Sequence, residues 1–237
     1  MYGDFARFYD RVQADAPHTF ASWILDRVNA HQARVASVLE LGCGTGAVLQ
    51  ALPGDWAKTG VDSSRDMLNQ AVNKTLDVKL VEADMTTAVL GERFDLVICV
   101  YDTINHLLSP DDWRRAFGVA HQHLRPGGLF LFDVHTIGRL RELAANSTFV
   151  HDFDSNTILM KVHELQPAQF EWEVRVFEAQ EGHFILHRQV IAESALPLSQ
   201  VRELLSAEGF DVLEARGNKE VDATDDSKRT FFVCRAT

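Results

Sequence analysis

Between Ala36 and Val134 the chain alternates short apolar runs with polar or glycine-containing turns and segments of helical periodicity. A continuous apolar run is typical of a strand buried on both faces, and strands joined by helices form a parallel sheet. The pattern therefore predicts five parallel strands, at Ser37–Leu41, Lys58–Asp62, Val78–Glu82, Phe94–Val100 and Leu129–Val134.

Two helices between these strands can be predicted from apolar spacing and end signals. Residues Ser63–Asn73 carry apolar side chains at helical spacing. A second helix begins at Ser109-Pro110-Asp111-Asp112, which offers a capping hydroxyl, a first-turn proline and first-turn acids. We expect it to run to Leu124 and to end at the turn Arg125–Gly128, because proline and paired glycines stop a helix.

The periodicity differs on either side of this unit. An N-terminal helical segment places Phe20, Trp23, Ile24 and Val28 on one face, which suits core packing. Residues Phe149–Glu193 alternate apolar and polar positions, with Gln180–Gly182 as a turn, and predict an antiparallel lobe.

The last part of the chain returns to the α/β pattern. Apolar residues at Val201, Leu204 and Leu205 predict a helix, and Gly209 is suited to end it. Phe210–Ala215 and Thr230–Arg235 then read as two closing strands. The polar segment between them is predicted to be a mobile loop.

Composition sets limits on the class of protein. A chain of 237 residues, 46% of them hydrophobic, can bury one core with an appended lobe. The 23 basic and 34 acidic residues give a net charge of −11, which repels phosphate backbones and argues against nucleic-acid partners. No apolar stretch approaches the length of a membrane span, so we expect neither a membrane helix nor a signal peptide and, by default, a cytoplasmic location. The three cysteines, Cys43, Cys99 and Cys234, are far apart, and we interpret them as reduced thiols.

The first predicted strand leads into the most informative motif, Glu40-Leu41-Gly42-Cys43-Gly44-Thr45-Gly46, which opens a helix near Ala47. Glycines let the chain turn tightly and let a ligand approach the backbone. Asp62 ends the next strand, where a carboxylate can accept hydrogen bonds from both ribose hydroxyls of an adenosine ligand.

Charge and spacing separate two ligands that would both suit this motif. The turn reads G-C-G-T-G and lacks the G-x-G-x-x-G spacing of dinucleotide sites. The Glu40 carboxylate would repel a pyrophosphate and attract the ammonium of S-adenosylmethionine, which also carries a sulfonium and has no phosphate. The pattern favours S-adenosylmethionine, with a nicotinamide dinucleotide as the alternative.

Five ordered segments resemble the class I S-adenosylmethionine-dependent methyltransferases: the glycine turn, Asp62 in GVDSSRDML, Glu82–Met85, Phe94–Val100 and Leu124–Gly128. The resemblance implies a doubly wound, mostly parallel sheet of seven strands with an antiparallel β insertion. It also implies that Asp62 binds the ribose, Asp84 the exocyclic amine of adenine and Met85 the adenine ring. The cofactor site expected on this basis is Tyr9, Glu40, Gly42, Cys43 (through its backbone), Gly44, Gly46, Asp62, Ser63, Met67, Asp84, Met85 and Tyr101.

Within this family the chain is most similar to small-molecule and sugar-amine N-methyltransferases. The likeness lies in Phe8-Tyr9-Asp10 near the start and in the loop Tyr101–His106, which ends in histidine. The sugar enzymes tend to carry serines where this loop has Tyr101-Asp102, so the acceptor class stays open. The expected division is a methyltransferase domain of residues 1–147 and 194–237, with residues 148–193 forming a lobe over the acceptor site.

His106 is the candidate catalytic residue. It follows the fourth predicted strand, at the edge where ligands of doubly wound sheets bind, and an imidazole can remove a proton from an amine or hydroxyl near neutral pH. The other interpretation is a solvated loop histidine. Tyr9 could close over the cofactor or pack beside Phe5 and Phe8, and Trp172 could line the acceptor pocket or belong to the core.

The sequence leaves three functions open. The first is a methyltransferase that acts on an amine or hydroxyl of a small-molecule acceptor; the others are an NAD-dependent oxidoreductase and a non-catalytic nucleotide-binding module. No metal site is expected, because His121 and His123 are two residues apart on a predicted helix and cannot share a face. A monomer and a homodimer are both compatible with the sequence.

Overall fold

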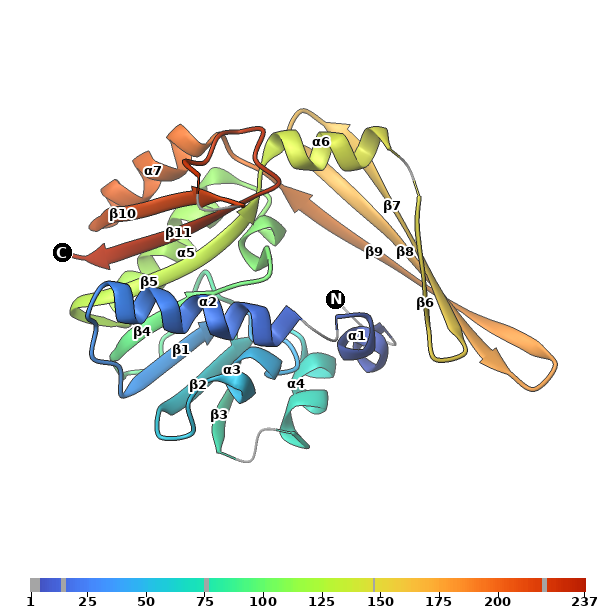
Figure 1. Ribbon diagram of the computed structural model, residues 1–237, viewed down its shortest axis with the longest axis horizontal. Coiled ribbons are helices and arrows are strands. Elements are labelled where there is room, and N and C mark those ends of the chain that lie inside the picture. The colour runs from blue at the N-terminus through green and yellow to red at the C-terminus, as the bar shows by residue number, and fades with distance from the viewer. Residues whose placement is uncertain (1–4, 14–15, 75–76, 147, 219–220) are drawn as a thin grey trace.

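The computed structural model describes residues 5–13, 16–74, 77–146, 148–218 and 221–237. In this part of the chain two sheets are present: sheet A with seven strands and sheet B with four (Figure 1). The proposed domain boundary at residue 147 lies outside the described residues. The described ranges contain no apolar helix of membrane-spanning length.

Sheet A has the strand order β10-β11-β5-β4-β1-β2-β3. Its strands are β1 (Ser37–Leu41), β2 (Ala57–Asp62), β3 (Val78–Glu82), β4 (Phe94–Cys99), β5 (Leu124–His135), β10 (Phe210–Gly217) and β11 (Arg229–Ala236). The first five run parallel, whereas β11 pairs antiparallel with both β5 and β10. The strand order reverses beside β1, and ligands of such sheets bind beyond the carboxyl ends of the strands at that point.

Helices cover both faces of sheet A, as a doubly wound sheet requires. On one face, α2 (Ala16–Ala30), α3 (Ala47–Ala51) and α4 (Arg65–Val72) pack around fully buried Ile24 and Leu49. On the other face, α5 (Pro110–Gln122) and α7 (Leu198–Ala207) enclose Trp113, Phe117 and stacked phenylalanines of β5 and β11. The predicted fold class is therefore confirmed.

Sheet B is the predicted antiparallel lobe. Its strands are β6 (Phe149–Phe153), β7 (Asn156–Gln166), β8 (Gln169–Gln180) and β9 (His183–Ser194), paired in chain order. One face carries Ile158, Val162 and Val174 in its buried core, and α1 (Ala6–Val12) and α6 (Ile137–Ala145) pack at its two ends. Figure 1 shows α1 between sheet A and this lobe.

Two features of the chain differ from the sequence-based expectation. The helix α5 ends at Gln122, and residues 124–128 belong to β5, because Leu124 already pairs with Phe94 through an irregular register. The Pro126-Gly127-Gly128 segment thus forms an irregular strand start rather than a turn. The helix α6 was not expected; Thr136 caps it by accepting a hydrogen bond from the Arg139 backbone (3.1 Å).

Candidate active site

The glycine turn after β1 is held against β2 by its own backbone. The Gly42 and Cys43 N–H groups both donate to the Val61 carbonyl, at 2.7 and 2.9 Å. Gly42 and Gly44 have φ angles of 71° and 52°, a region that side chains disfavour. A Cβ on Gly42 would also lie 2.2 Å from Thr103 Cγ2. The turn therefore needs glycine both for its conformation and for the close approach of the loop after β4.

Asp62, at the tip of β2, is fixed by two backbone donors. Its carboxylate accepts from the Gly44 N–H (2.8 Å) and from the Ser64 N–H (2.7 Å), one bond to each oxygen. Burial raises the pKa of Asp62, and these two hydrogen bonds oppose the rise because they stabilise the charged form. The carboxylate is thus oriented before any ligand binds.

A cavity of about 170 Å³, here called the strand-tip cavity, lies against Asp62. Besides Asp62, it collects expected cofactor residues from two segments: Ser63 and Met67 around the start of α4, and Asp84 and Met85 after β3. Asp84 is preorganised, because one of its oxygens accepts from the Thr86 backbone and hydroxyl, both at 2.7 Å.

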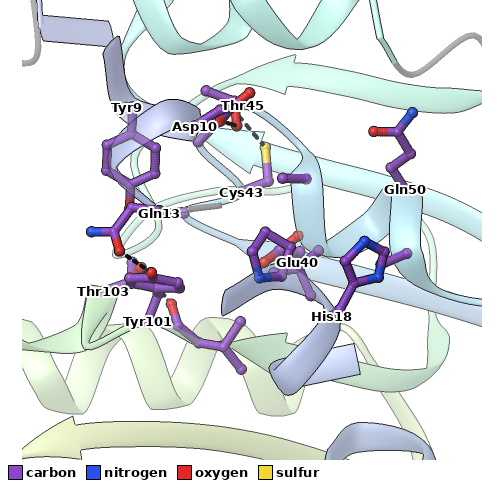
Figure 2. Close-up of a pocket in the computed structure, with 17 residues that line it drawn as sticks. Tyr9, Asp10, Gln13, His18, Glu40, Cys43, Thr45, Gln50, Tyr101 and Thr103 are labelled. Carbon is purple, nitrogen blue, oxygen red and sulfur yellow. Dashed lines mark hydrogen bonds between the residues drawn. The ribbon is translucent and has the colours of Figure 1, made fainter. Parts of the chain in front are cut away.

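Glu40 lines a second cavity of about 520 Å³, the glycine-turn cavity. Glu40 is only 3% exposed, and its Oε2 atom has no hydrogen-bond partner among the described residues. Burial raises the pKa of Glu40 well above its ordinary value, and the nearby Asp62 raises it further. Figure 2 shows Tyr9, Gln13 and Tyr101 on one side of this cavity, with Glu40 and His18 across from them. The Tyr101 hydroxyl donates to Gln13, which ties the loop after β4 to the N-terminal segment.

These two cavities meet at Tyr9, Gly42, Gly44 and Thr103, which line both. Neither has a lysine or arginine among its described lining residues, so a pyrophosphate would find no cationic partner there. The orphaned carboxylate oxygen of Glu40 instead needs a hydrogen-bond donor, and an ammonium supplies one. The residues present fit S-adenosylmethionine, and nothing in the pocket supports the dinucleotide alternative.

Of two further expected cofactor residues, Gly46 and Cys43, only Cys43 lines one of these cavities. Gly46 does not line either cavity; it caps α3 in the left-handed region, with φ at 71°. Cys43 lines the glycine-turn cavity, but burial and the Glu40 carboxylate raise the pKa of its thiol well above the ordinary value. The thiol therefore stays protonated and is not a nucleophile.

A third cavity of about 440 Å³, the lobe cavity, opens between the edge of sheet A, the N-terminal helices and sheet B. Tyr9 and Thr103 line all three cavities. His106 lines the lobe cavity and the strand-tip cavity. Its wall from sheet B carries apolar Met160, Val174 and Ile191. Its polar lining includes Asp102, His135, Trp172, Glu193 and Arg229, which together are here called the polar wall.

Sequence reasoning missed most of that polar wall. His135 ends β5 at the same carboxyl edge of the sheet that made His106 a candidate. Because ligands of such sheets bind at this edge, the same argument could have identified His135. Trp172, for which the sequence left the acceptor pocket and the core both open, lines this wall. Glu193 and Arg229 carry no local signal, because they reach the cavity only through the way β9 and β11 fold back.

The loop that carries His106 is fixed by buried polar contacts. Asn105 is fully buried; its amide donates to the His135 carbonyl (3.0 Å) and the Ser194 carbonyl (2.8 Å), and its oxygen accepts from the His135 N–H (3.0 Å). This one side chain therefore joins the loop to the end of β5 and to the end of β9. The neighbouring His106 faces the cavities from a short 3-10 turn, Thr103–His106.

Residues 38–128 match a protein family described as a methyltransferase domain. A protein of Geobacillus sp. (strain WCH70) that carries a methyltransferase name is 27% identical over 244 residues, covering 99% of each chain. The dTDP-3-amino-3,4,6-trideoxy-alpha-D-glucopyranose N,N-dimethyltransferase of Streptomyces venezuelae is 30% identical over 114 residues, 48% of each chain.

The fold has a close counterpart in the crystal structure of an S-adenosylmethionine-dependent methyltransferase from Clostridium acetobutylicum ATCC 824. The TM-score is 0.88 at 21% identity, and the match covers 99% of this chain and 98% of the other. The fold, the cationic-ligand pocket and these matches agree. The chain is a class I S-adenosylmethionine-dependent methyltransferase.

Proposed function

We propose that this methyltransferase moves the methyl group of S-adenosylmethionine to the amine nitrogen of a small molecule. The observation that carries the proposal is the junction of the three cavities at Tyr9 and Thr103. A lobe cavity of about 440 Å³ has the size of a small-molecule pocket, and it opens onto the place where the cofactor would present its methyl group.

The names of the relatives favour an amine rather than a hydroxyl as the group that accepts the methyl. The Streptomyces venezuelae protein is named for the dimethylation of an amino sugar nucleotide, and its similarity lies within about half of this chain. The Tyr101–His106 loop and the polar wall of the lobe cavity supply proton acceptors, which an amine needs because it is mostly protonated near neutral pH.

The proposed cofactor contacts follow from the two other cavities. The buried carboxylate of Glu40 would take the ammonium of the methionine part, directly or through water, and Asp62 would accept from the ribose hydroxyls. Asp84 would accept from the adenine amine, while Met67 and Met85 would pack against the ring. The glycine turn would bring its backbone against the cofactor.

When bound, the cofactor supplies a methyl group on a sulfonium: the acceptor lone pair bonds to the methyl carbon as the carbon–sulfur pair leaves with sulfur. The protein contributes alignment and proton handling. His106, where the lobe and strand-tip cavities meet, would take the proton of the acceptor nitrogen. Tyr9 on α1 and Thr103 would border the transfer path, and α1 would exclude water from it.

The lobe of residues 148–193, inserted between residues 1–147 and 194–237, would cover the acceptor. Support comes from its side chains Met160, Trp172, Val174 and Ile191, which line the lobe cavity. The lobe would thus set acceptor specificity while the α/β unit binds the cofactor.

A panel of small amines and alcohols, incubated with the protein and S-adenosylmethionine, tests the proposal by chromatographic detection of S-adenosylhomocysteine. We expect turnover with amines, and we expect His106→Gln to lower kcat by about 10²-fold at unchanged cofactor affinity. His163→Gln on the lobe, outside the cavity, is the matched control. Turnover restricted to alcohols, or binding of cofactor with no turnover of any acceptor, would contradict it.

A cytoplasmic location and a monomeric or homodimeric state complete the proposal. The location is supported by Cys43, Cys99 and Cys234, which are all buried and free. Cell fractionation tests the location, and light scattering after gel filtration tests the mass. A membrane-bound fraction or an assembly larger than two chains would refute the respective part.

A further inference from the structure

Three buried polar atoms on the wall of the lobe cavity lack a hydrogen-bond partner among the described residues: His135 Nδ1, Trp172 Nε1 and Glu193 Oε2. They come from three strands, β5, β8 and β9. Glu193 is only 4% exposed, and the rings of His135 and Trp172 stack with centroids 6.3 Å apart and planes 22° apart. Because an unsatisfied buried polar group is costly, three on one cavity wall indicate a place built for a ligand.

The same wall places Asp102 beside His135 and Glu193, with one potential metal-ligand atom of each residue within 4.8 Å of the others. A divalent cation is therefore the first occupant to consider. Arg229 argues against it, because its Nη2 lies 2.9 Å from His135 Nε2 and 2.7 Å from Asp102 Oδ1.

A guanidinium only donates hydrogen bonds, so His135 Nε2 must accept from Arg229. In the neutral imidazole the proton then sits on Nδ1. A metal would need the lone pair of that same Nδ1, and it would lie close to the fixed positive charge of Arg229. The cluster is therefore unsuited to a metal ion.

The Nδ1–H of His135 points toward two carboxylates without reaching either. Glu193 Oε2 lies 3.9 Å away and Asp102 Oδ2 3.8 Å away, too far for a direct hydrogen bond. The separation is short enough for a single oxygen between them to bond to both nitrogen and carboxylate. The second orphaned donor, Trp172 Nε1–H, lines the same wall.

The occupant must accept from an N–H and donate to a carboxylate. An ammonium has no lone pair and would leave both donors unsatisfied; a carboxylate or phosphate would be repelled by Glu193 and Asp102. A hydroxyl has one donor and two lone pairs, and it is uncharged. We infer that Glu193, His135 and Trp172 form a subsite for a hydroxyl group of the methyl acceptor, so that the preferred acceptor is a hydroxylated amine.

This inference rests on the proposed function, and binding and turnover separate the two. The probes are trans-2-aminocyclohexanol and cyclohexylamine, which differ by one hydroxyl next to the amine carbon. Binding of each to the protein saturated with S-adenosylhomocysteine is measured by calorimetry or ligand-observed NMR. We expect the hydroxylated probe to bind roughly tenfold more tightly or better, since the hydrogen bonds involve a buried charged partner.

Two variants remove the subsite in different ways. Glu193→Gln exchanges the charged carboxylate acceptor for a neutral amide, and Trp172→Phe removes the N–H while keeping an aromatic ring. Both should bring the two probe affinities within about twofold of each other while cofactor affinity stays unchanged. Glu171→Gln, on β8 but outside the cavity lining, is the matched control and should keep the preference.

Equal affinities of the wild-type complex for the two probes, including no measurable binding of either, would overturn the inference. An equal loss of affinity for both probes in Glu193→Gln would also overturn the inference. It would mean that the subsite holds the amine itself or only water. Binding of Mn²⁺ that depends on Glu193 would establish the metal site instead. If the protein prefers the hydroxylated probe but transfers methyl groups to no amine, the proposed function is refuted and the subsite stands. If it methylates both probes with equal kcat/KM, the subsite is refuted and the proposed function stands.

Discussion

Asp133 and Arg229 form an ion pair between the end of β5 and the start of β11, with the Asp133 side chain fully buried and that of Arg229 19% exposed. The same carboxylate accepts from the consecutive N–H groups of Tyr101 (2.6 Å) and Asp102 (3.0 Å), whose φ angles are 71° and 49°. Two consecutive N–H groups of a turn that donate to one carboxylate form a small anion site. One buried carboxylate therefore holds both the C-terminal strand and the strained loop that leads to His106.

Replacing Asp133 by asparagine should lower the free energy of unfolding by about 3 to 5 kcal/mol, because it leaves a buried guanidinium with one carboxylate fewer and puts an amide donor against backbone donors. Urea unfolding followed by circular dichroism measures the loss. Arg216→Ala breaks an exposed pair with Asp222 and should change stability little. Equal effects of the two substitutions would show that the buried pair adds nothing beyond a surface one.

Gly42→Ala should weaken binding of S-adenosylmethionine by about tenfold or more, because its Cβ would collide with Thr103 Cγ2 and shift the loop at the cavity junction. Gly91→Ala is the matched control: its φ is also 71°, but nothing lies within 4 Å of the added Cβ. It should therefore carry the conformational cost alone.

Adding Thr103→Ser to Gly42→Ala should recover part of the lost affinity, because serine lacks the colliding methyl and keeps the hydroxyl that donates to the Val100 carbonyl (2.7 Å). Calorimetric titration of all four proteins with S-adenosylmethionine forms a double-mutant cycle. Additive effects of the two substitutions would exclude the contact as the cause.

The affinity for S-adenosylmethionine should rise with pH through a window above the ordinary pKa of glutamate. In the ligand-free protein, burial and the charge of Asp62 raise the pKa of Glu40. A bound ammonium favours the ionised carboxylate and therefore lowers that pKa. The complex then holds fewer protons than the free protein, so binding releases protons and tightens as pH rises toward the raised pKa.

Titrations in two buffers of different ionisation enthalpy, from about pH 5 to about pH 8, measure the released protons. Glu40→Gln should remove most of the release. For the ligand-free protein the sign is opposite: the folded chain keeps a proton that the unfolded chain loses, so stability falls as pH rises through the same window. Proton uptake on binding would contradict the assignment of the ammonium to Glu40.

Asp62→Asn should weaken cofactor binding by about ten- to a hundredfold. An amide has one accepting oxygen, whereas Asp62 uses both of its oxygens on the Gly44 and Ser64 N–H groups, so the NH₂ group must face a donor. Asp66→Asn, an exposed residue in the first turn of α4, is the control. Unchanged affinity in Asp62→Asn would count against placing the ribose there.

Asn105→Ala should lower kcat by about tenfold or more with a smaller effect on cofactor affinity, because the loop carrying His106 loses its three hydrogen bonds to β5 and β9. Steady-state kinetics with the best amine from the panel measures it. Asn146→Ala removes a side-chain bond at the exposed end of α6 and should leave kcat unchanged. A change confined to stability would mean that Asn105 does not position the catalytic loop.

Much of sheet A was predictable, because strands buried on both faces leave an unmistakable apolar run. The predicted β1 and β3 match the structure to the residue, and β2 and β4 match within one residue at one end. The start of β5 was predicted wrongly: proline and glycine usually end an element, but here the irregular pairing of Leu124 with Phe94 continues the sheet through them.

The cofactor side and the acceptor side of the candidate site also differ in how far the sequence predicts them. Glu40, the glycines and Asp62 follow each other along adjoining strands, so their spacing alone indicates a ligand site. Trp172 and Glu193 alternate with their neighbours as any strand residue does, and only the pairing of β8 with β9 puts them on one face.

By itself the sequence determined the parallel core, the glycine turn and the charge of the cofactor pocket, because these depend on periodicity and on residues close together in the chain. Only the tertiary structure decided the acceptor side. There His135, Glu193 and Arg229 meet from strands far apart in the sequence, and no local pattern records a contact that forms when the lobe and the last strand close over the sheet edge.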